Sequence, residues 1–405
     1  MQKLIIRNGL VITPFDLRRD ISVLVKDGLI DSLAADGDIH ESDCQVIDAG
    51  GCYVCPGFVD IHTHGGGGSD FMDATADDLA VAMAYHSSQG TTALLASTVA
   101  APVGQMTAML DLIRRYRSQI VAGCRLLGAH LEGPFLSEKN RGAHLPQFLL
   151  VPASAGWQFV RDYADVIVNL TVAPELPGSI SLIRDLAERG IIISGGHDDA
   201  LDSEIRQATD AGMSNVTHVF CANSTIAFRH GRRQVGLACR SLIDDRLTVE
   251  MIADNHHLPP DLVRLIYQCK GAGRACVVSD CLRAGGMPAD GQEYVLGPRS
   301  AAKAQHAVVA DGVASLPDGS RYAGSITPLS GMVRNMVRDC GIPLIDAVRM
   351  ASATPAAIIR QNDIGSIVPG KKADFCLLDN NLNVAKTIVG GQIVYDRESI
   401  PAGLS

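Results

Sequence analysis

The sequence has few aromatic residues, no excess of positive charge and no long apolar run. Aromatic residues make up 4% of the chain, and 35 Lys and Arg stand against 44 Asp and Glu, for a formal charge of −9. This balance argues against a general surface for nucleic acid. No apolar run reaches the roughly 18 residues of a membrane-spanning helix, and the first residues lack a signal-peptide core. We therefore expect a cytoplasmic protein that binds neither nucleic acid nor membrane.

The sequence also lacks the pattern of a disulfide framework. Its 11 cysteines are odd in number and scattered in spacing, which is typical of reduced thiols in a long chain without a secretion signal. The one CxxC motif, Cys52 to Cys55, has no second pair to complete a zinc site. We expect these two cysteines to be structural.

The globular composition and a change in the pattern of apolar residues along the chain indicate the fold. Hydrophobic residues make up 47% and charged residues 20% of the chain. Both ends consist of short β-rich segments, and the turn signals Asn8-Gly9 and Asp27-Gly28 predict two hairpins in the first of them. We predict that residues 1–57 and 351–405 share a small β-sandwich domain.

Between these ends, eight short apolar runs alternate with helix-length amphipathic segments. Eight strands and their crossovers in about 290 residues match a (β/α)8 barrel of the TIM type. A doubly wound parallel sheet remains an alternative, because it shows the same periodicity. We predict an α/β fold with a catalytic barrel over residues 58–350. The predicted strands are 58–62, 92–97, 125–131, 166–172, 191–194, 215–220, 248–253 and 275–279.

Metal-ligating residue types occur at the ends of these runs. The first run ends in His62 and His64, which share a face because residues two apart on a strand point the same way. The ends of barrel strands meet at one face, where catalytic groups lie. One such residue alone carries little weight, but five suitable strand ends together predict a metal site. The other positions are Glu132, His197, His218 and Asp280.

The residue types also suggest a reaction. Neutral imidazoles and a carboxylate suit Zn²⁺ or Fe²⁺. Such an ion lowers the pKa of bound water toward about 7 and polarises a carbonyl group. An aspartate on a neighbouring strand can take the water proton and pass it to a leaving amine. The set predicts metal-assisted hydrolysis of an amide or a related bond.

Several motifs resemble those of a known family. The segment PGFVDIHTH over 56–64 is similar to the first-strand motif of the amidohydrolase superfamily, and 352–374 is similar to its return to a β-sandwich. HLEGPF over 130–135, followed by GAH over 142–144, resembles the N-acetylglucosamine-6-phosphate deacetylase family more specifically. In that family a glutamate on the third strand binds the metal. The resemblance covers nearly the whole chain.

The resemblance implies an activity and a set of roles. It implies removal of the acetyl group from N-acetyl-D-glucosamine 6-phosphate, giving D-glucosamine 6-phosphate and acetate, by a homodimer. Asp280 would be the general base and then the general acid. The implied metal ligands are Glu132, His197 and His218 for the main ion, and His62 and His64 for a second ion that only some members bind.

The part of the pattern that binds sugar and phosphate departs from the family. Cys221 stands where an asparagine is usual, and Asn255 replaces a glycine and is expected to reshape the pocket wall. The basic loop 229–236, which would lie near the partner's active site, is longer than usual, and its arginines suit a dianion. Arg233 is the alternative to Arg232 within it. The implied substrate-binding residues are His144, Ala222, Arg232 and His257.

These departures leave other functions open. The substrate could be another N-acetylated amino-sugar phosphate, such as N-acetylgalactosamine 6-phosphate, or a different small amide. A scaffold protein without catalysis is the alternative of a different class. Such a protein would have lost metal ligands or Asp280, and this chain retains them all.

Overall fold

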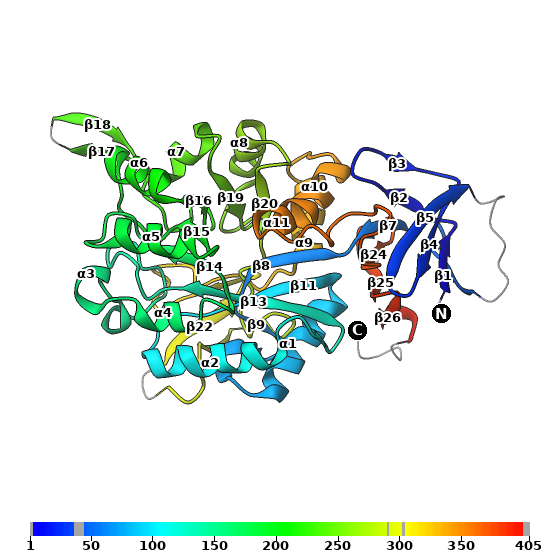
Figure 1. Ribbon diagram of the computed structural model, residues 1–405, viewed down its shortest axis with the longest axis horizontal. Coiled ribbons are helices and arrows are strands. Elements are labelled where there is room, and N and C mark those ends of the chain that lie inside the picture. Colours follow the sequence, from blue (N-terminus) through cyan, green and yellow to red (C-terminus); the bar gives the residue numbers. More distant parts are fainter. Residues whose placement is uncertain (1–2, 36–43, 230, 290, 302–303, 400–405) are drawn as a thin grey trace.

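Eight parallel strands form one curled sheet in the computed structural model of the chain (Figure 1). Their order in the sheet follows their order in the sequence, as a barrel requires. All eight predicted runs contribute a strand. The structure describes residues 3–35, 44–229, 231–289, 291–301 and 304–399. The strands are β8 (Phe58–Thr63), β11 (Thr91–Ser97), β13 (Cys124–Glu132), β14 (Ile167–Val172), β15 (Ile192–Gly195), β16 (Met213–Val216), β19 (Thr248–Met251) and β20 (Ala275–Val277).

The first and last strands of this sheet approach each other and complete the ring. Directly after β20, the N–H of Asp280 donates to the carbonyl of His62 at 2.9 Å. The N–H of Ser279 donates to the buried carboxylate of Asp60 on β8 at 3.2 Å. These bonds join the two edges, so the predicted TIM-type barrel is confirmed and the doubly wound alternative is wrong.

Helices cover the outside of the barrel. The first of them, α1, begins directly after Thr75, because Thr75 Oγ1 accepts the N–H of Asp78 and caps the helix. Among the described residues, none of the helices has the length and apolarity needed to span a bilayer. The helices are α1 (Ala76–Ser88), α2 (Val103–Tyr116), α3 (Pro152–Ala155), α4 (Gln158–Asp162), α5 (Ser179–Glu188), α6 (Asp202–Ala211), α7 (Leu237–Ile243), α8 (Pro260–Lys270), α9 (Leu329–Arg338), α10 (Leu344–Ala351) and α11 (Ala353–Ile358).

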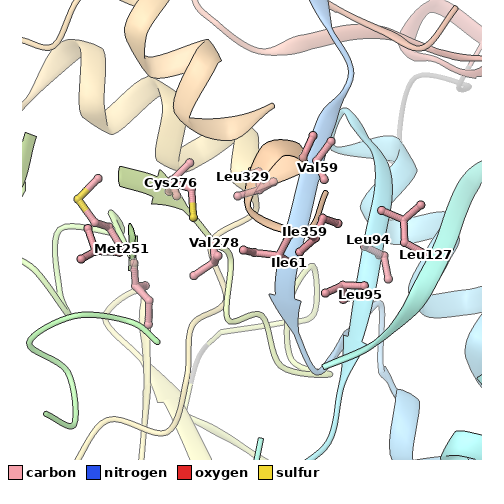
Figure 2. Close-up of a cluster of buried hydrophobic side chains, with 14 of the residues drawn as sticks. Val59, Ile61, Leu94, Leu95, Leu127, Met251, Cys276, Val278, Leu329 and Ile359 are labelled. Atoms are coloured by element: carbon pink, nitrogen blue, oxygen red, sulfur yellow. The ribbon is translucent and has the colours of Figure 1, made fainter. Parts of the chain in front are cut away.

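The main hydrophobic core lies between the strands and these helices. Figure 2 shows Val59 and Ile61 of β8 beside Leu329 and Ile359, which come from the helical layer. Burying one such aliphatic side chain contributes about 2 kcal/mol. Because apolar residues of β8 pack outward, the residues that alternate with them, Asp60 and His62, are directed into the barrel. The core therefore fixes which residues of the strand reach the site.

The two ends of the chain share a β-sandwich, as predicted (Figure 1). One sheet has the order β5-β4-β1-β6 and the other β26-β25-β24-β7-β2-β3, with a separate apolar cluster between them. The domain boundaries at residues 57 and 350 stay a prediction. The strands are β1 (Lys3–Arg7), β2 (Leu10–Ile12), β3 (Leu17–Arg18), β4 (Ile21–Lys26), β5 (Leu29–Ala35), β6 (Gln45–Asp48), β7 (Tyr53–Pro56), β24 (Phe375–Leu378), β25 (Val384–Val389) and β26 (Gln392–Asp396).

One of the two predicted hairpins in this domain is wrong. Asp27-Gly28 does close a hairpin, because Lys26 and Leu29 pair across a two-residue turn with positive φ values of 51° and 79°. Asn8-Gly9 instead carries the chain from one sheet to the other, since β1 and β2 lie in different sheets. A side chain at Gly9 would meet Val54 at 2.5 Å, so this crossing needs glycine.

Smaller strands extend from the barrel. The sheet β21-β22-β23, which follows the eighth barrel strand, has its own apolar cluster and was not predicted. The 11 cysteines are free thiols. The additional strands are β9 (Gly65–Gly66), β10 (Ser69–Asp70), β12 (Ile120–Val121), β17 (Ile226–Arg229), β18 (Arg232–Val235), β21 (Gln292–Leu296), β22 (Gln305–Ala310) and β23 (Val313–Ser315).

Candidate active site

Strand ends bring the predicted ligands of the main metal ion together. Glu132, the last residue of β13, places Oε1 3.1 Å from Nε2 of His197 and 3.1 Å from Nε2 of His218. The two imidazole nitrogens are also 3.1 Å apart. All three side chains are buried and line a pocket of about 600 Å³. Such a set of one carboxylate and two imidazoles is typical of a divalent metal site.

The predicted second set faces the same glutamate. His64 Nε2 is 3.3 Å from Glu132 Oε2 and 3.1 Å from Asp280 Oδ1. His62 Nε2 is 3.5 Å from Glu132 Oε1 and 3.5 Å from Asp280 Oδ1. Donor atoms of His62, His64 and Glu132 lie within 4.8 Å of one another. The structure therefore brings the five predicted ligands and Asp280 together in one cluster, and their roles stay a prediction.

The residues present fit a bound cation. His62 is fully buried, and its Nε2 has no hydrogen-bond partner among the described residues. A buried polar atom without a partner costs about 1–3 kcal/mol. A cation between this nitrogen and the facing carboxylates would offset that cost. The described site therefore supports metal binding.

The charges in the cluster stabilise one another. Burial opposes ionisation of Glu132 and Asp280, but the facing histidines, His62 foremost, hold the pKa of both carboxyl groups below the usual range. Burial also opposes charge on His64, but Asp280 and Glu132 raise the pKa of that imidazole to about 9. The facing histidines therefore favour the ionised form of Asp280, which is the form that a general base requires.

Three site residues have an unusual backbone conformation. The φ values of His197, His218 and Asp280 are 47°, 26° and 44°, in the left-handed region that residues with side chains rarely adopt. Such a residue costs on the order of 1–3 kcal/mol and persists only where the surroundings hold it. At Asp280, the carbonyl accepts the N–H of Ser325 at 2.8 Å. The strained strand ends direct the side chains into the pocket.

Sequence reasoning missed two supporting residues. Glu250 on β19 is fully buried, and its Oε2 is 3.2 Å from Nδ1 of His62. His130 is engaged on both nitrogens, by Ser97 Oγ at 3.0 Å and Thr171 Oγ1 at 2.8 Å, so it supports the site rather than binding metal. The available signal for Glu250 was a charged residue inside an otherwise apolar run.

Three of the predicted substrate-binding residues line the pocket: His144, Ala222 and His257. His144 Nδ1 accepts the N–H of Ala100 at 3.1 Å, so the neutral ring carries its proton on Nε2. That nitrogen lies 3.4 Å from Glu132 Oε2. His257 is held through Nδ1 by Asp254 at 2.7 Å, which leaves its other nitrogen for a ligand.

The fourth residue, Arg232, lies elsewhere. It is exposed on β18, and the hairpin of β17 and β18 extends beyond the barrel at the end away from the β-sandwich (Figure 1). It is not among the residues that line the pocket. Its alternative, Arg233, is exposed on the same strand, and His230 of this loop lies outside the described residues. The role of this loop stays a prediction.

Other cations line the pocket instead. Lys139 forms an ion pair with Asp199 at 2.7 Å. Arg321 donates to the carbonyl of Gly142 at 3.2 Å, and in the part of the chain that the structure describes no carboxylate lies within ion-pair distance of it. Its positive charge is therefore available to a bound anion.

The two single residues that differ from the family pattern, Cys221 and Asn255, lie in different places relative to the pocket. Cys221 lines the pocket. Asn255 has a φ of 67°, which asparagine tolerates where glycine is usual, and its amide donates to Asp339 at 2.7 Å. Asn255 is not among the lining residues. Of these two residues, only Cys221 is in a position to contact a ligand directly.

The barrel, its β-sandwich and the histidine–carboxylate cluster are those of a metal-dependent hydrolase. The chain belongs to the amidohydrolase family, whose model matches residues 53–394. Within that family the predicted resemblance to the N-acetylglucosamine-6-phosphate deacetylases is confirmed. The chain is 35% identical to the enzyme of that name from Vibrio furnissii, over 90% of this chain and 88% of that one.

Two further matches bear on the substrate. The N-acetylgalactosamine-6-phosphate deacetylase of Escherichia coli O157:H7 is 32% identical, over 84% of this chain and 87% of that one. A structure of a variant of N-acetyl-D-glucosamine-6-phosphate deacetylase from Mycobacterium smegmatis, in complex with N-acetyl-D-glucosamine-6-phosphate, is 31% identical. It superposes with a TM-score of 0.86 and covers 97% of this chain and 100% of that one.

Proposed function

We propose that the protein hydrolyses N-acetyl-D-glucosamine 6-phosphate to D-glucosamine 6-phosphate and acetate. The observation that carries this proposal is the position of Asp280. Its ionised carboxylate lies 3.1 Å from His64 Nε2, beside the cluster around Glu132, in a pocket large enough for a sugar phosphate. A base and a divalent metal site in one cavity suit the hydrolysis of an acetamide.

The ion that we propose is Zn²⁺ or Fe²⁺. Glu132, His197 and His218 would hold the main ion, and His62 and His64, together with Glu132, would hold a second ion. When bound, such an ion lowers the pKa of water and polarises a carbonyl group. The imidazole and carboxylate donors of the cluster support this choice of metal.

The chain's own residues move the protons. Asp280 takes a proton from the attacking water, and the same carboxylic acid then protonates the departing amine nitrogen. Nε2 of His64 lies 3.1 Å from this carboxylate. The Nε2–H of His144 is positioned to donate a hydrogen bond to the acetyl oxygen as negative charge develops there. General acid–base catalysis of this kind contributes about 10²- to 10⁴-fold in rate.

The phosphate end of the substrate would contact His257 and Ala222, with Arg321 of the same chain. We propose that Arg232 reaches the same phosphate from a second copy of the chain in a homodimer. Ile226 and Phe228 on the projecting hairpin are 59% and 73% exposed. A partner that covered these apolar side chains would support this arrangement.

A cytoplasmic location follows from the same proposal. All 11 cysteines are free thiols, and free thiols persist in a reducing compartment. The proposed substrate supports the same location, because a charged sugar phosphate does not cross a membrane unaided.

A second candidate function is deacetylation of the galactosamine isomer. The similarity to the N-acetylgalactosamine-6-phosphate deacetylase of Escherichia coli O157:H7 supports it. Cys221, which stands where the family usually has an asparagine, lies in the pocket wall. A different small amide is the remaining alternative from the sequence.

Comparing kcat/KM for the two isomeric phosphates tests this choice. We expect the N-acetylglucosamine ester to be preferred by the zinc-loaded protein. Preference for the N-acetylgalactosamine ester would assign the protein to the second candidate. Turnover of an amide without a phosphate at a higher kcat/KM would contradict both.

A further inference from the structure

A buried glutamate contacts the metal cluster from outside the pocket. Glu250 lies on β19, is 0% exposed and is not among the residues that line the pocket. Its Oε2 is 3.2 Å from Nδ1 of His62, and its Oε1 accepts from Nδ2 of Asn215 at 2.7 Å. Both carboxylate oxygens therefore have a donor inside the barrel.

Asn215 is itself held in one orientation. Its Oδ1 accepts from Thr248 Oγ1 at 2.7 Å, and its Nδ2 also donates to Ser194 Oγ at 2.9 Å. The amide of Asn215 thus directs an N–H toward Glu250. This bond leaves Oε2 of the glutamate to accept from His62.

This arrangement determines which nitrogen of His62 faces the cluster with a lone pair. Because Nδ1 donates its hydrogen to Glu250, Nε2 carries none once the ring is in the neutral form that a metal ligand requires. Nε2 lies 3.5 Å from Oε1 of Glu132 and 3.5 Å from Oδ1 of Asp280, and it has no hydrogen-bond partner among the described residues. These three acceptor atoms, one nitrogen and two carboxylate oxygens, lie close together, and such a set is complementary to a cation.

We infer that Glu250 is a positioning residue that commits His62 to binding a second divalent cation. Together with Asn215, it sets whether the chain holds one ion or two. The inference rests on the proposed metal site, but it does not depend on which sugar is the substrate. A carboxylate behind a ligating histidine commonly orients the ring and raises its basicity.

The substitution Glu250→Gln tests this role with little change in shape. The side-chain oxygen of the glutamine would turn to the fixed N–H of Asn215, so its NH₂ group would face Nδ1 of His62. His62 would then have to accept at Nδ1 and carry its hydrogen on Nε2, where it cannot bind metal. We expect the affinity for the second ion to fall about 10- to 100-fold, with the main ion unaffected.

The measurement is the number of zinc ions per chain as a function of buffered free Zn²⁺, by elemental analysis. The main ion at Glu132, His197 and His218 serves as the internal test that the variant is folded. Adding Asn215→Asp to Glu250→Gln supplies an acceptor for the glutamine NH₂ and returns its oxygen to His62. We expect this double variant to regain second-ion affinity.

Glu293→Gln is the matched control. Glu293 pairs with Nδ1 of His306 at 3.1 Å on the exposed sheet of β21 and β22, outside the pocket. It should leave both zinc affinities unchanged.

Two results would overturn the inference. One is wild-type second-ion affinity in Glu250→Gln, and the other is a wild-type chain that saturates at one zinc. If a chain binds two ions with the expected dependence on Glu250 but releases no acetate, the inference stands and the proposed substrate fails. The two proposals are therefore tested separately.

Discussion

The histidine–carboxylate cluster and the region proposed to bind phosphate are built in different ways. The cluster consists of buried strand-end residues, and the side-chain nitrogen and oxygen atoms of facing residues are 3.1–3.5 Å apart. The cations proposed for the phosphate are on loops and a hairpin, and both Arg232 and Arg321 are exposed. The barrel therefore fixes the chemistry, whereas loops set the choice of substrate. Perturbing the first region should change kcat, and perturbing the second should change KM.

Removing the metal is expected to have the largest effect. Treatment of the protein with a chelator should lower acetate release by about 10⁴-fold or more, because carbonyl polarisation and activation of water contribute several kcal/mol. Zinc or ferrous iron added back in slight excess should restore the rate. A metal-free protein, verified by elemental analysis, that retained its rate would contradict the role given to the cluster.

The substitution Asp280→Asn should have the next largest effect. The amide cannot take the water proton, so kcat should fall by about 10³-fold. The main ion should remain bound, because it is assigned to Glu132, His197 and His218 and not to Asp280. An active variant that holds its full metal content would remove Asp280 from the mechanism.

Smaller effects are expected at the phosphate end. Arg321→Ala and Arg232→Ala should each raise KM for the phosphorylated substrate by about 10-fold, because each removes one charge-assisted hydrogen bond, and should leave kcat nearly unchanged. The exposed Arg264 pairs with Asp261 outside the pocket, and Arg264→Ala is the control. A fall in kcat with unchanged KM in either variant would contradict the expectation that this region affects KM and the cluster affects kcat.

Mixing two variants would show whether Arg232 acts from a partner. In a hybrid dimer of Asp280→Asn and Arg232→Ala chains, one site receives both an intact Asp280 and an intact Arg232 only if the arginine crosses the interface. Activity at low substrate should then exceed the sum of the two parents. Strictly additive activity in verified hybrids would place Arg232 in its own chain or outside the site.

The smallest effect should come from Cys221→Asn, which restores the residue usual in the family. Because Cys221 lines the pocket, we expect the ratio of kcat/KM between the glucosamine and galactosamine esters to change by about fivefold. Asn255→Gly, at a residue that does not line the pocket, is the control and should leave that ratio unchanged. Equal ratios in Cys221→Asn and wild type would exclude Cys221 as a determinant of sugar choice.

Sequence reasoning predicted the cluster because regular geometry places its members. His62 and His64 share a face through the two-residue period of a strand, and a barrel brings strand ends to one side. Glu132, His197 and Asp280 follow buried runs that a pattern of apolar residues reveals. Taken together, these local patterns were sufficient to predict the cluster, although none of them was sufficient alone.

The remaining features depend on contacts between distant segments. Glu250 supports His62 from across the barrel, and a single sequence does not show which buried polar residue is its partner. Asn8-Gly9 has the composition of a hairpin turn, but its flanking strands pair with different neighbours. Arg232 has the residue type for a phosphate site, but its position depends on a hairpin whose packing the sequence pattern does not specify.

The most direct test of the central claim is acetate release by the purified, zinc-supplemented protein from N-acetyl-D-glucosamine 6-phosphate, with the unphosphorylated sugar measured alongside. We expect efficient turnover of the phosphate ester and, at the same concentration, little turnover of the free sugar. No acetate from either compound, with metal shown to be bound, would contradict the proposed substrate. Equal turnover of both would contradict the phosphate-binding role given to Arg321, Arg232 and His257.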